Sequence, residues 1–236
     1  SALSQGHVGS GRPSVHRRVV LGWRGGPWVV LDRVSRPGLR QALARWYLAP
    51  DITPVMERAG VVDAVTDSTV PALASVAFPC SPTVELENRD VSFRLGGRSP
   101  SKVIAARADT SGRVVTLVAG PATQWVSNHP SGGPEAAWGC ASGRWRHTVI
   151  VRPEGLPSWC PFGVDSDAEL AWCIEPQDAD ERGSARLCLV AQREGTARGA
   201  AREERGCIPF GVTVLERAAG GWRALPNEEF GQSATE

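Results

Sequence analysis

Residues 15–34 read VHRRVVLGWRGGPWVVLDRV and carry the pattern of a β-hairpin. Two runs rich in β-branched residues flank Gly25 and Gly26, and glycine supplies the backbone freedom that a tight turn needs. Alternation along the first run places His16 and Arg18 on one face of a strand and Arg17 on the other. The stretch therefore predicts two paired strands joined by the turn Arg24–Pro27, with a His-Arg-Arg triplet whose purpose must be explained.

The charge balance argues against two broad classes of function. The chain has 236 residues, with 26 Lys and Arg against 25 Asp and Glu, for a formal net charge of +1. General binders of nucleic acid or membrane surfaces rely on a concentrated basic field, and this chain has none. No run approaches the roughly 18 apolar residues of a transmembrane helix. We therefore expect neither nucleic acid nor membrane as a partner.

The opening residues SALSQGHVGS contain no Met and lack the basic and apolar regions of a signal peptide. The sequence favours a fragment of a longer protein.

Short β-rich runs recur along most of the chain, separated by clusters of Pro, Gly, Asp and Ser. This spacing predicts an all-β fold, a large antiparallel β-sandwich, over residues 1–226 as one domain, followed by a frayed tail at 227–236. The runs after the first hairpin are ASVAF, TVELE, VSFRL, KVIAAR, RVVTLVAG, RHTVIVR, ELAWCI, RLCLVAQ and VTVLER.

Residues 38–50, GLRQALARWYLAP, can be interpreted in two ways. Leu39, Leu43 and Trp46 have helical spacing, and Leu, Ala and Arg favour helix. A weaker alternation puts Leu39, Leu43 and Tyr47 on one face of a strand. The local sequence alone favours a short helix.

The six cysteines, at positions 80, 140, 160, 173, 188 and 207, form no CxxC motif and match no zinc-site spacing with histidine. The runs ELAWCI and RLCLVAQ lie on either side of a polar stretch around Asp180. They predict a hairpin in which Cys173 and Cys188 lie opposite each other. A disulfide between them and buried free thiols are both compatible with the sequence.

The block from His7 to Pro50 resembles the C-terminal β-sandwich of heparinase II/III-type polysaccharide lyases. That family has a His-Asp-Gly-Tyr stretch, a His-Arg-Arg strand, a W-V-V-x-D-R strand and a strand ending in W-H-L-A-P. The corresponding pieces here are HVGSGRP, VHRRVVL, WRGGPWVVLDRV and ARWYLAPD, and a weaker likeness extends to about residue 120. The resemblance implies a supersandwich-like sheet fold and a strand over residues 39–48, against the local helical propensity.

The resemblance also implies an activity and a division of labour. Such lyases cleave uronic-acid polysaccharides, glycosaminoglycans among them, by β-elimination, with most catalytic groups on an upstream α/α-toroid and a metal site also upstream. This chain has no run of amphipathic helices for a toroid. Because the resemblance places the family's metal site upstream, we expect no cofactor in this chain. Implied partners are an anionic polysaccharide and the toroid, and the implied location is secreted or periplasmic.

Candidate substrate-binding residues are His7, Arg12, His16 and Arg18. Arginine can grip a carboxylate or sulfate through its fork of N–H groups. In the alternative, the triplet is the polar end of an edge strand, with Arg17 paired to Asp32 or another acid.

The aromatic residues divide by the regularity of their surroundings. Tyr47 is expected in the core, as are the strand tryptophans Trp23, Trp28, Trp46 and Trp172. Trp125, Trp138, Trp145 and Trp159 lie in looser sequence and are better candidates for exposed sugar contacts.

Several positions depart from the family pattern. Val8 and Ser10 stand in place of Asp and Tyr, Tyr47 in place of His, and Leu95 in place of a common Tyr. The leading hypothesis is therefore the supporting sandwich of a lyase without the main catalytic residues. The alternatives are a non-catalytic carbohydrate-binding or structural module and, third, a secreted disulfide-rich adhesion domain.

Overall fold

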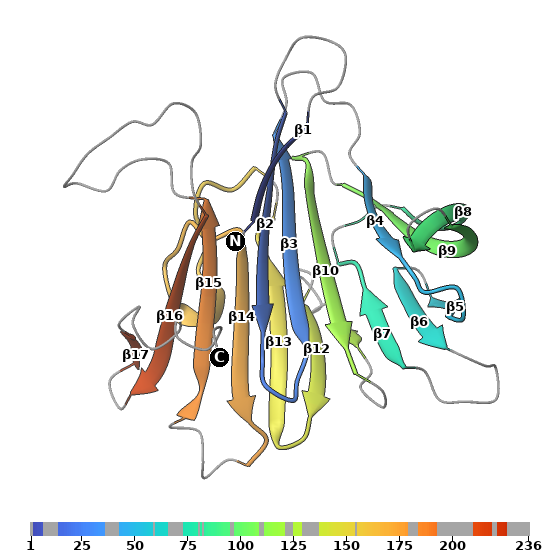
Figure 1. Cartoon of the computed structure of the whole chain (residues 1–236). Coiled ribbons are helices and arrows are strands. Elements are labelled where there is room, and N and C mark those ends of the chain that lie inside the picture. The colour runs from blue at the N-terminus through green and yellow to red at the C-terminus, as the bar shows by residue number, and fades with distance from the viewer. Residues whose placement is uncertain are drawn as a thin grey trace, which may run out of the picture. The chain divides into compact units, whose positions relative to one another are not determined.

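The structure of the chain, a computed structural model, describes fifteen stretches of the sequence. These are residues 2–6, 14–35, 43–58, 60–65, 73–79, 81, 83–94, 97–108, 111–120, 125–128, 137–153, 155–178, 184–192, 210–218 and 221–225. Within these ranges the regular structure is strand, apart from one 3₁₀ turn at Pro161–Gly163, and every strand pairing is antiparallel (Figure 1). The predicted all-β, antiparallel fold class is confirmed.

The chain divides into two compact units, residues 1–125 and 126–236, each of which is described by itself. The single domain predicted over 1–226 stays a prediction, and the predicted tail 227–236 lies outside the described residues.

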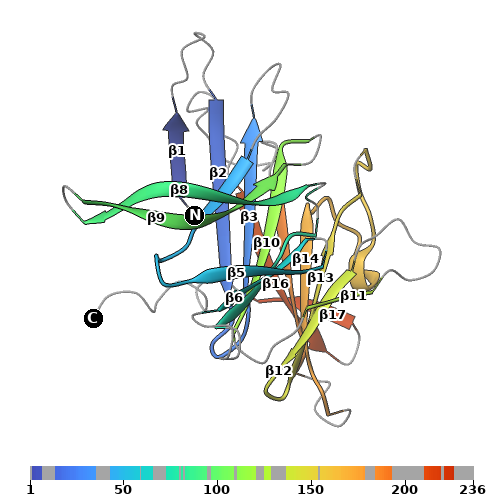
Figure 2. The same ribbon diagram turned by 90° about the vertical axis from the view of Figure 1, so that its right-hand side faces the viewer.

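The first unit has a seven-stranded sheet in the order β1-β2-β3-β10-β7-β6-β5 and a three-stranded sheet in the order β4-β9-β8. Strands β8 and β9 form one long hairpin, seen as a twisted ribbon in Figure 2. Residues 84–87 of the run TVELE and 91–94 of the run VSFRL thus belong to a single strand, β8, where two were expected. The bounds are Ala2–Gly6 (β1), Ser14–Gly22 (β2), Trp28–Ser35 (β3), Leu43–Tyr47 (β4), Thr53–Arg58 (β5), Val61–Val65 (β6), Ala74–Ala77 (β7), Val84–Arg94 (β8), Gly97–Arg107 (β9) and Arg113–Ala119 (β10).

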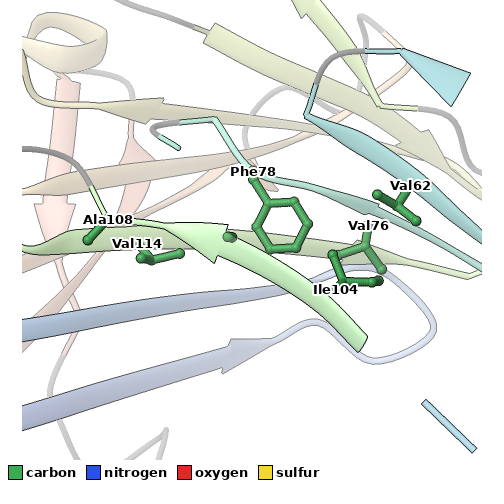
Figure 3. Close-up of a cluster of buried hydrophobic side chains, with 7 residues drawn as sticks. Val62, Val76, Phe78, Ile104, Ala108 and Val114 are labelled. Atoms are coloured by element: carbon green, nitrogen blue, oxygen red, sulfur yellow. The ribbon is translucent and has the colours of Figure 1, made fainter. Parts of the chain in front are cut away.

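The two sheets of this unit pack face to face around an apolar core. Val62, Val76 and Val114 of the seven-stranded sheet meet Ile104 and Ala106 of β9, with the side chain of Phe78 in the same cluster (Figure 3). Removing this apolar surface from water is the main driving force that holds the two layers together. The first unit is a sandwich, as the sequence pattern predicted.

Residues 43–47 form strand β4, which confirms the strand implied by the resemblance for this part of 39–48. The strand pairs with β9, Leu43 opposite Arg107 and Tyr47 opposite Val103. Ala44 and Trp46 pack against the core, whereas Leu43 and Tyr47 are exposed. Pairing to β9 and burial of alternate side chains outweigh a helical preference of a few tenths of a kcal/mol per residue.

The second unit contains a seven-stranded meander in chain order from β11 to β17. Between β13 and β14, residues 159–168 fold over one face of this sheet, where Trp159 packs with Ala171, Leu187 and Leu215. Trp159 also donates its indole N–H to the carbonyl of Ala168 at 2.7 Å. The bounds are Val126–Asn128 (β11), Ala137–Ser142 (β12), Trp145–Val151 (β13), Leu170–Pro176 (β14), Arg186–Gln192 (β15), Phe210–Ala218 (β16) and Gly221–Ala224 (β17).

The predicted hairpin around residue 180 forms, but its register differs by one residue from the expected one. Trp172 pairs with Cys188, and Cys173 pairs with Leu187. Because successive side chains alternate between faces, this slip puts Cys173 and Cys188 on opposite faces of the sheet. Both are buried free thiols, so the Cys173–Cys188 disulfide is wrong. Burial raises the pKa of each thiol to about 12.

His147 is fully buried on the second sheet. It lies on β13, opposite Cys140 of β12 and Ile174 of β14, with its ring centroid 5.8 Å from that of Trp172. Burial disfavours the imidazolium form and lowers the pKa of His147 to about 4. His147 is therefore neutral in the folded protein near pH 7.

Lowering the pH should destabilise the folded protein, because His147 is buried in its neutral form. Between the ordinary pKa of 6.5 and the folded pKa of about 4, the unfolded chain binds a proton at His147 that the folded chain does not. The free energy of unfolding should therefore fall as the pH is lowered through this window, by up to about 1.4 kcal/mol per pH unit. Denaturant unfolding followed by tryptophan fluorescence at several pH values measures this slope. His147→Leu should flatten the slope, and equal slopes in the two proteins would contradict the assignment.

Candidate functional site

The β2–β3 hairpin places the His-Arg-Arg triplet next to a buried acid. The loop between the strands is closed by backbone hydrogen bonds from Gly26 N–H to the Trp23 carbonyl and from Trp23 N–H to the Pro27 carbonyl. Gly25 has a φ of 71°, a left-handed conformation that favours glycine at the third position of such a turn. This geometry sets Arg18 directly opposite Asp32 on the neighbouring strand.

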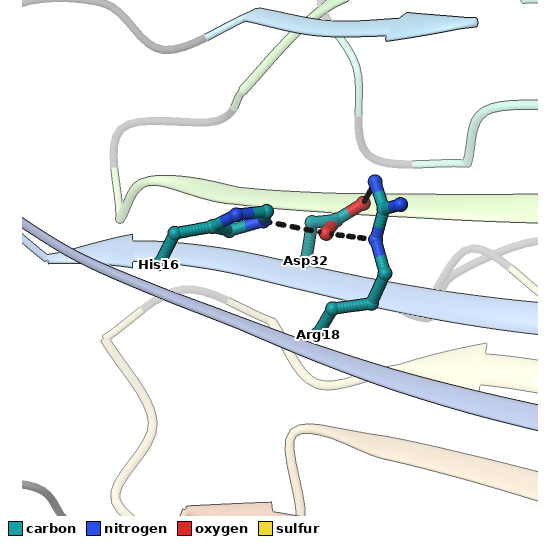
Figure 4. A network of polar contacts seen from close by, with 3 residues as sticks. All are labelled: His16, Arg18 and Asp32. Carbon is teal, nitrogen blue, oxygen red and sulfur yellow. Dashed lines mark hydrogen bonds and ion pairs between the residues drawn. The ribbon is translucent and has the colours of Figure 1, made fainter. Parts of the chain in front are cut away.

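Asp32 holds both His16 and Arg18 (Figure 4). Arg18 Nε donates to Asp32 Oδ1 at 2.7 Å, and Arg18 Nη2 donates to Oδ2 at 3.0 Å. His16 Nε2 lies 2.7 Å from Asp32 Oδ1. Since an ionised carboxylate can only accept, Nε2 carries the hydrogen, and Nδ1 is left as an acceptor in the neutral imidazole. Both side chains are thus oriented by one carboxylate.

Burial differs sharply between the acid and its two partners. The Asp32 side chain is 4% exposed, whereas those of His16 and Arg18 are 35% and 38% exposed. The hydrogen bond and charge of Asp32 raise the pKa of Arg18, so the guanidinium stays charged. A buried carboxylate requires such a partner, because an unpaired ion in the protein interior is strongly destabilising. Asp32 is therefore the buried anchor of this cluster, the residue that holds His16 and Arg18 in place. The two basic side chains are the groups that reach solvent.

The Arg18 guanidinium lies over the indole ring of Trp46 on β4. The central guanidinium carbon is 5.6 Å from the ring centroid, within the range of a cation–π contact. Arg18 belongs to the seven-stranded sheet and Trp46 to the three-stranded sheet. The contact links the two sheets of the first unit.

Of the four predicted site residues, the structure brings two together. His16 and Arg18 share a face and a partner. His7 and Arg12 lie outside the described residues. Arg17 is buried on the opposite face of β2, so the alternative pairing of Arg17 with Asp32 is wrong.

The reason for this correction is a register shift of one residue. A turn at Arg24–Pro27 with Gly25-Gly26 at its tip would put Asp32 opposite Val19, on the face of Arg17. The observed loop is closed at Trp23 and Pro27, which moves Asp32 onto the face of Arg18. Sequence reasoning missed Asp32 as a site residue for the same reason. The signal that could have found it is a negative charge directly after four apolar residues in the strand WVVLDRV.

The expected division of the aromatic residues is wrong for five of them. Trp125, Trp138 and Trp159 are buried, whereas Trp28 is 53% exposed and Tyr47 is 54% exposed. Trp172 is buried and Trp46 packs against the core, as expected. The Trp28 ring lies against the backbone of Gly22, where an added Cβ would come within 2.9 Å of ring carbons. Irregular sequence around a tryptophan therefore does not predict exposure here: Trp138 lies in strand β12, and Trp159 lies in a segment that folds over its sheet.

The described residues contain neither a metal-binding cluster nor a helix able to span a membrane. Across the stretches that the structure describes, no group of three or more His, Cys, Asp or Glu residues is arranged to hold a metal ion. Nor do those stretches contain a helix of the length and apolar character needed to cross a bilayer.

Comparison with known proteins gave no relative: no family model, no curated protein and no solved structure matches the chain.

Removing Arg18 should destabilise the first unit. In Arg18→Ala the buried Asp32 keeps only His16, and we expect a loss of about 2 kcal/mol in the free energy of unfolding. This is less than the roughly 3–5 kcal/mol typical of a fully buried pair, because the Arg18 side chain is 38% exposed. Denaturant unfolding measures the change.

Arg89→Ala is the matched control. Arg89 pairs with Glu87 on β8, and its side chain is 52% exposed. Exposed ion pairs contribute little, so this variant should unfold like the parent protein. Equal losses in the two variants would contradict a special role for the Asp32 anchor.

Proposed function

We propose that this chain is the C-terminal β-sandwich part of a heparinase II/III-like polysaccharide lyase that cleaves uronic-acid-containing polysaccharides by β-elimination. The observation that carries the proposal is the series β2, β3 and β4 in the block that bears the resemblance. The third of these strands forms against the helical preference of its own residues, as the resemblance implied. The His-Arg-Arg strand also presents two basic side chains on one face.

β-Elimination needs three chemical contributions. The charge of the uronate carboxylate is neutralised, a base takes the proton from the adjacent carbon, and an acid protonates the leaving oxygen. Arg18 is suited to the first of these, since it keeps its positive charge and is partly exposed. The base and acid would come from the upstream toroid, and the sandwich would support it and line one side of the cleft.

A non-catalytic module is the second candidate, and specific residues favour it. Val8, Ser10 and Tyr47 stand where the family has Asp, Tyr and His, so three polar groups of the family pattern are missing. A sandwich that only binds carbohydrate or supports a neighbouring domain has no need of them.

The test is elimination activity measured through the ultraviolet absorbance of the unsaturated uronate product. The chain is assayed alone and joined to any coding sequence that precedes Ser1 in its gene, with heparan sulfate, alginate and hyaluronan as substrates and dextran as the neutral control. The proposal expects no product from the chain alone and product from the joined protein on an anionic polymer. If neither the chain alone nor the joined protein forms product on any of the three polymers, the lyase is contradicted and the non-catalytic module is favoured.

A further inference from the structure

Arg18 has a second hydrogen-bonding edge that its anchor does not use. A guanidinium carries five N–H donors. Asp32 takes one from Nε and one from Nη2, and it is the hydrogen-bond partner of Arg18 within the described part of the chain. The edge formed by Nη1 and the remaining Nη2 hydrogen matches the two oxygens of a carboxylate. Since the side chain is 38% exposed, an anion from solvent can reach it.

The same contacts hold this edge in a fixed direction. One side of the guanidinium is bound to a buried carboxylate, and its central carbon lies over the Trp46 ring at 5.6 Å from the centroid. An arginine held in this way loses little conformational entropy when it binds a ligand, whereas a free surface arginine loses much more. Asp32 and Trp46 therefore act as positioning residues for Arg18.

His16 adds an acceptor beside these donors. Its Nε2–H donates to Asp32, and in this tautomer the other ring nitrogen, Nδ1, is a hydrogen-bond acceptor. His16 and Arg18 lie two residues apart on one strand face, about 7 Å between their Cα atoms. A sugar residue spans such a distance with a carboxylate at one side and a hydroxyl at another.

We propose that Arg18 and His16, both oriented by Asp32, form a binding site for one uronate residue of a polysaccharide. Arg18 takes the carboxylate through its outer edge, and His16 accepts a hydrogen bond from a hydroxyl group of the same or the adjacent sugar. The site rests on the anionic-polysaccharide substrate of the proposed function and adds to it the residues and the group that each one recognises.

The test is calorimetric titration of the full chain with oligogalacturonate, which carries carboxylates and no sulfate. Arg18→Lys keeps the charge and loses the planar fork, and it should weaken binding by about tenfold. Arg89→Ala removes one exposed positive charge from β8 and should bind as the parent does. His16→Phe should weaken binding without abolishing it, because the carboxylate contact remains.

Three results would overturn the site. They are no binding of oligogalacturonate to the parent at low salt, equal binding by Arg18→Lys, and an equal loss in Arg89→Ala, which would indicate general charge attraction. Dextran sulfate distinguishes recognition of a sulfate from recognition of a carboxylate. Tighter binding of this sulfated polymer than of oligogalacturonate would contradict uronate recognition.

The binding titration and the elimination assay test different claims, so one can fail while the other succeeds. Binding without elimination would keep the uronate site and favour the module. Elimination by the joined protein without binding at Arg18 would keep the lyase and reject the site.

Discussion

The site depends on one buried carboxylate. Asp32 is 3% exposed in the middle of strand β3, and taking its charge out of water requires compensation from groups nearby. Arg18 and His16 provide it from the paired strand, and their tips remain partly in solvent. The need to satisfy Asp32 therefore determines where the two basic side chains point. Trp46 extends the constraint to the second sheet of the unit through its contact with Arg18.

Strand positions were predictable from the sequence, but their register was not. Alternation and turn residues correctly marked β2, β3 and the β14–β15 hairpin. In both hairpins the true pairing differs by one residue from the expected one, and a slip of one residue moves every side chain to the other face. That is why the alternative pairing of Arg17 with Asp32 and the expected facing positions of Cys173 and Cys188 are wrong. The loop geometry that decides the register, such as closure at Trp23 and Pro27, depends on φ angles that composition does not specify.

Long-range packing accounts for the other differences. Residues 43–47 favour helix locally and become a strand because β9 offers a pairing edge and a core. Only the family resemblance predicted this strand. Burial of Trp159 follows from a loop that folds back over its own sheet, which no local pattern reports. Trp28 is exposed although it lies in a strand, with its ring over Gly22. His16 and Arg18 were recognised as candidates from the triplet, whereas their shared anchor required the paired strand.

We infer that Arg18 and Asp32 stabilise the hairpin together, as a coupled pair. A double-mutant cycle with Arg18→Ala, Asp32→Ala and the double variant measures this coupling directly in the free energy of unfolding. We predict a coupling energy of at least about 1.5 kcal/mol, because each single variant leaves a group without its main partner and the double variant does not. Additive losses, with a coupling energy below about 0.5 kcal/mol, would contradict the anchor and the orientation of Arg18 inferred from it.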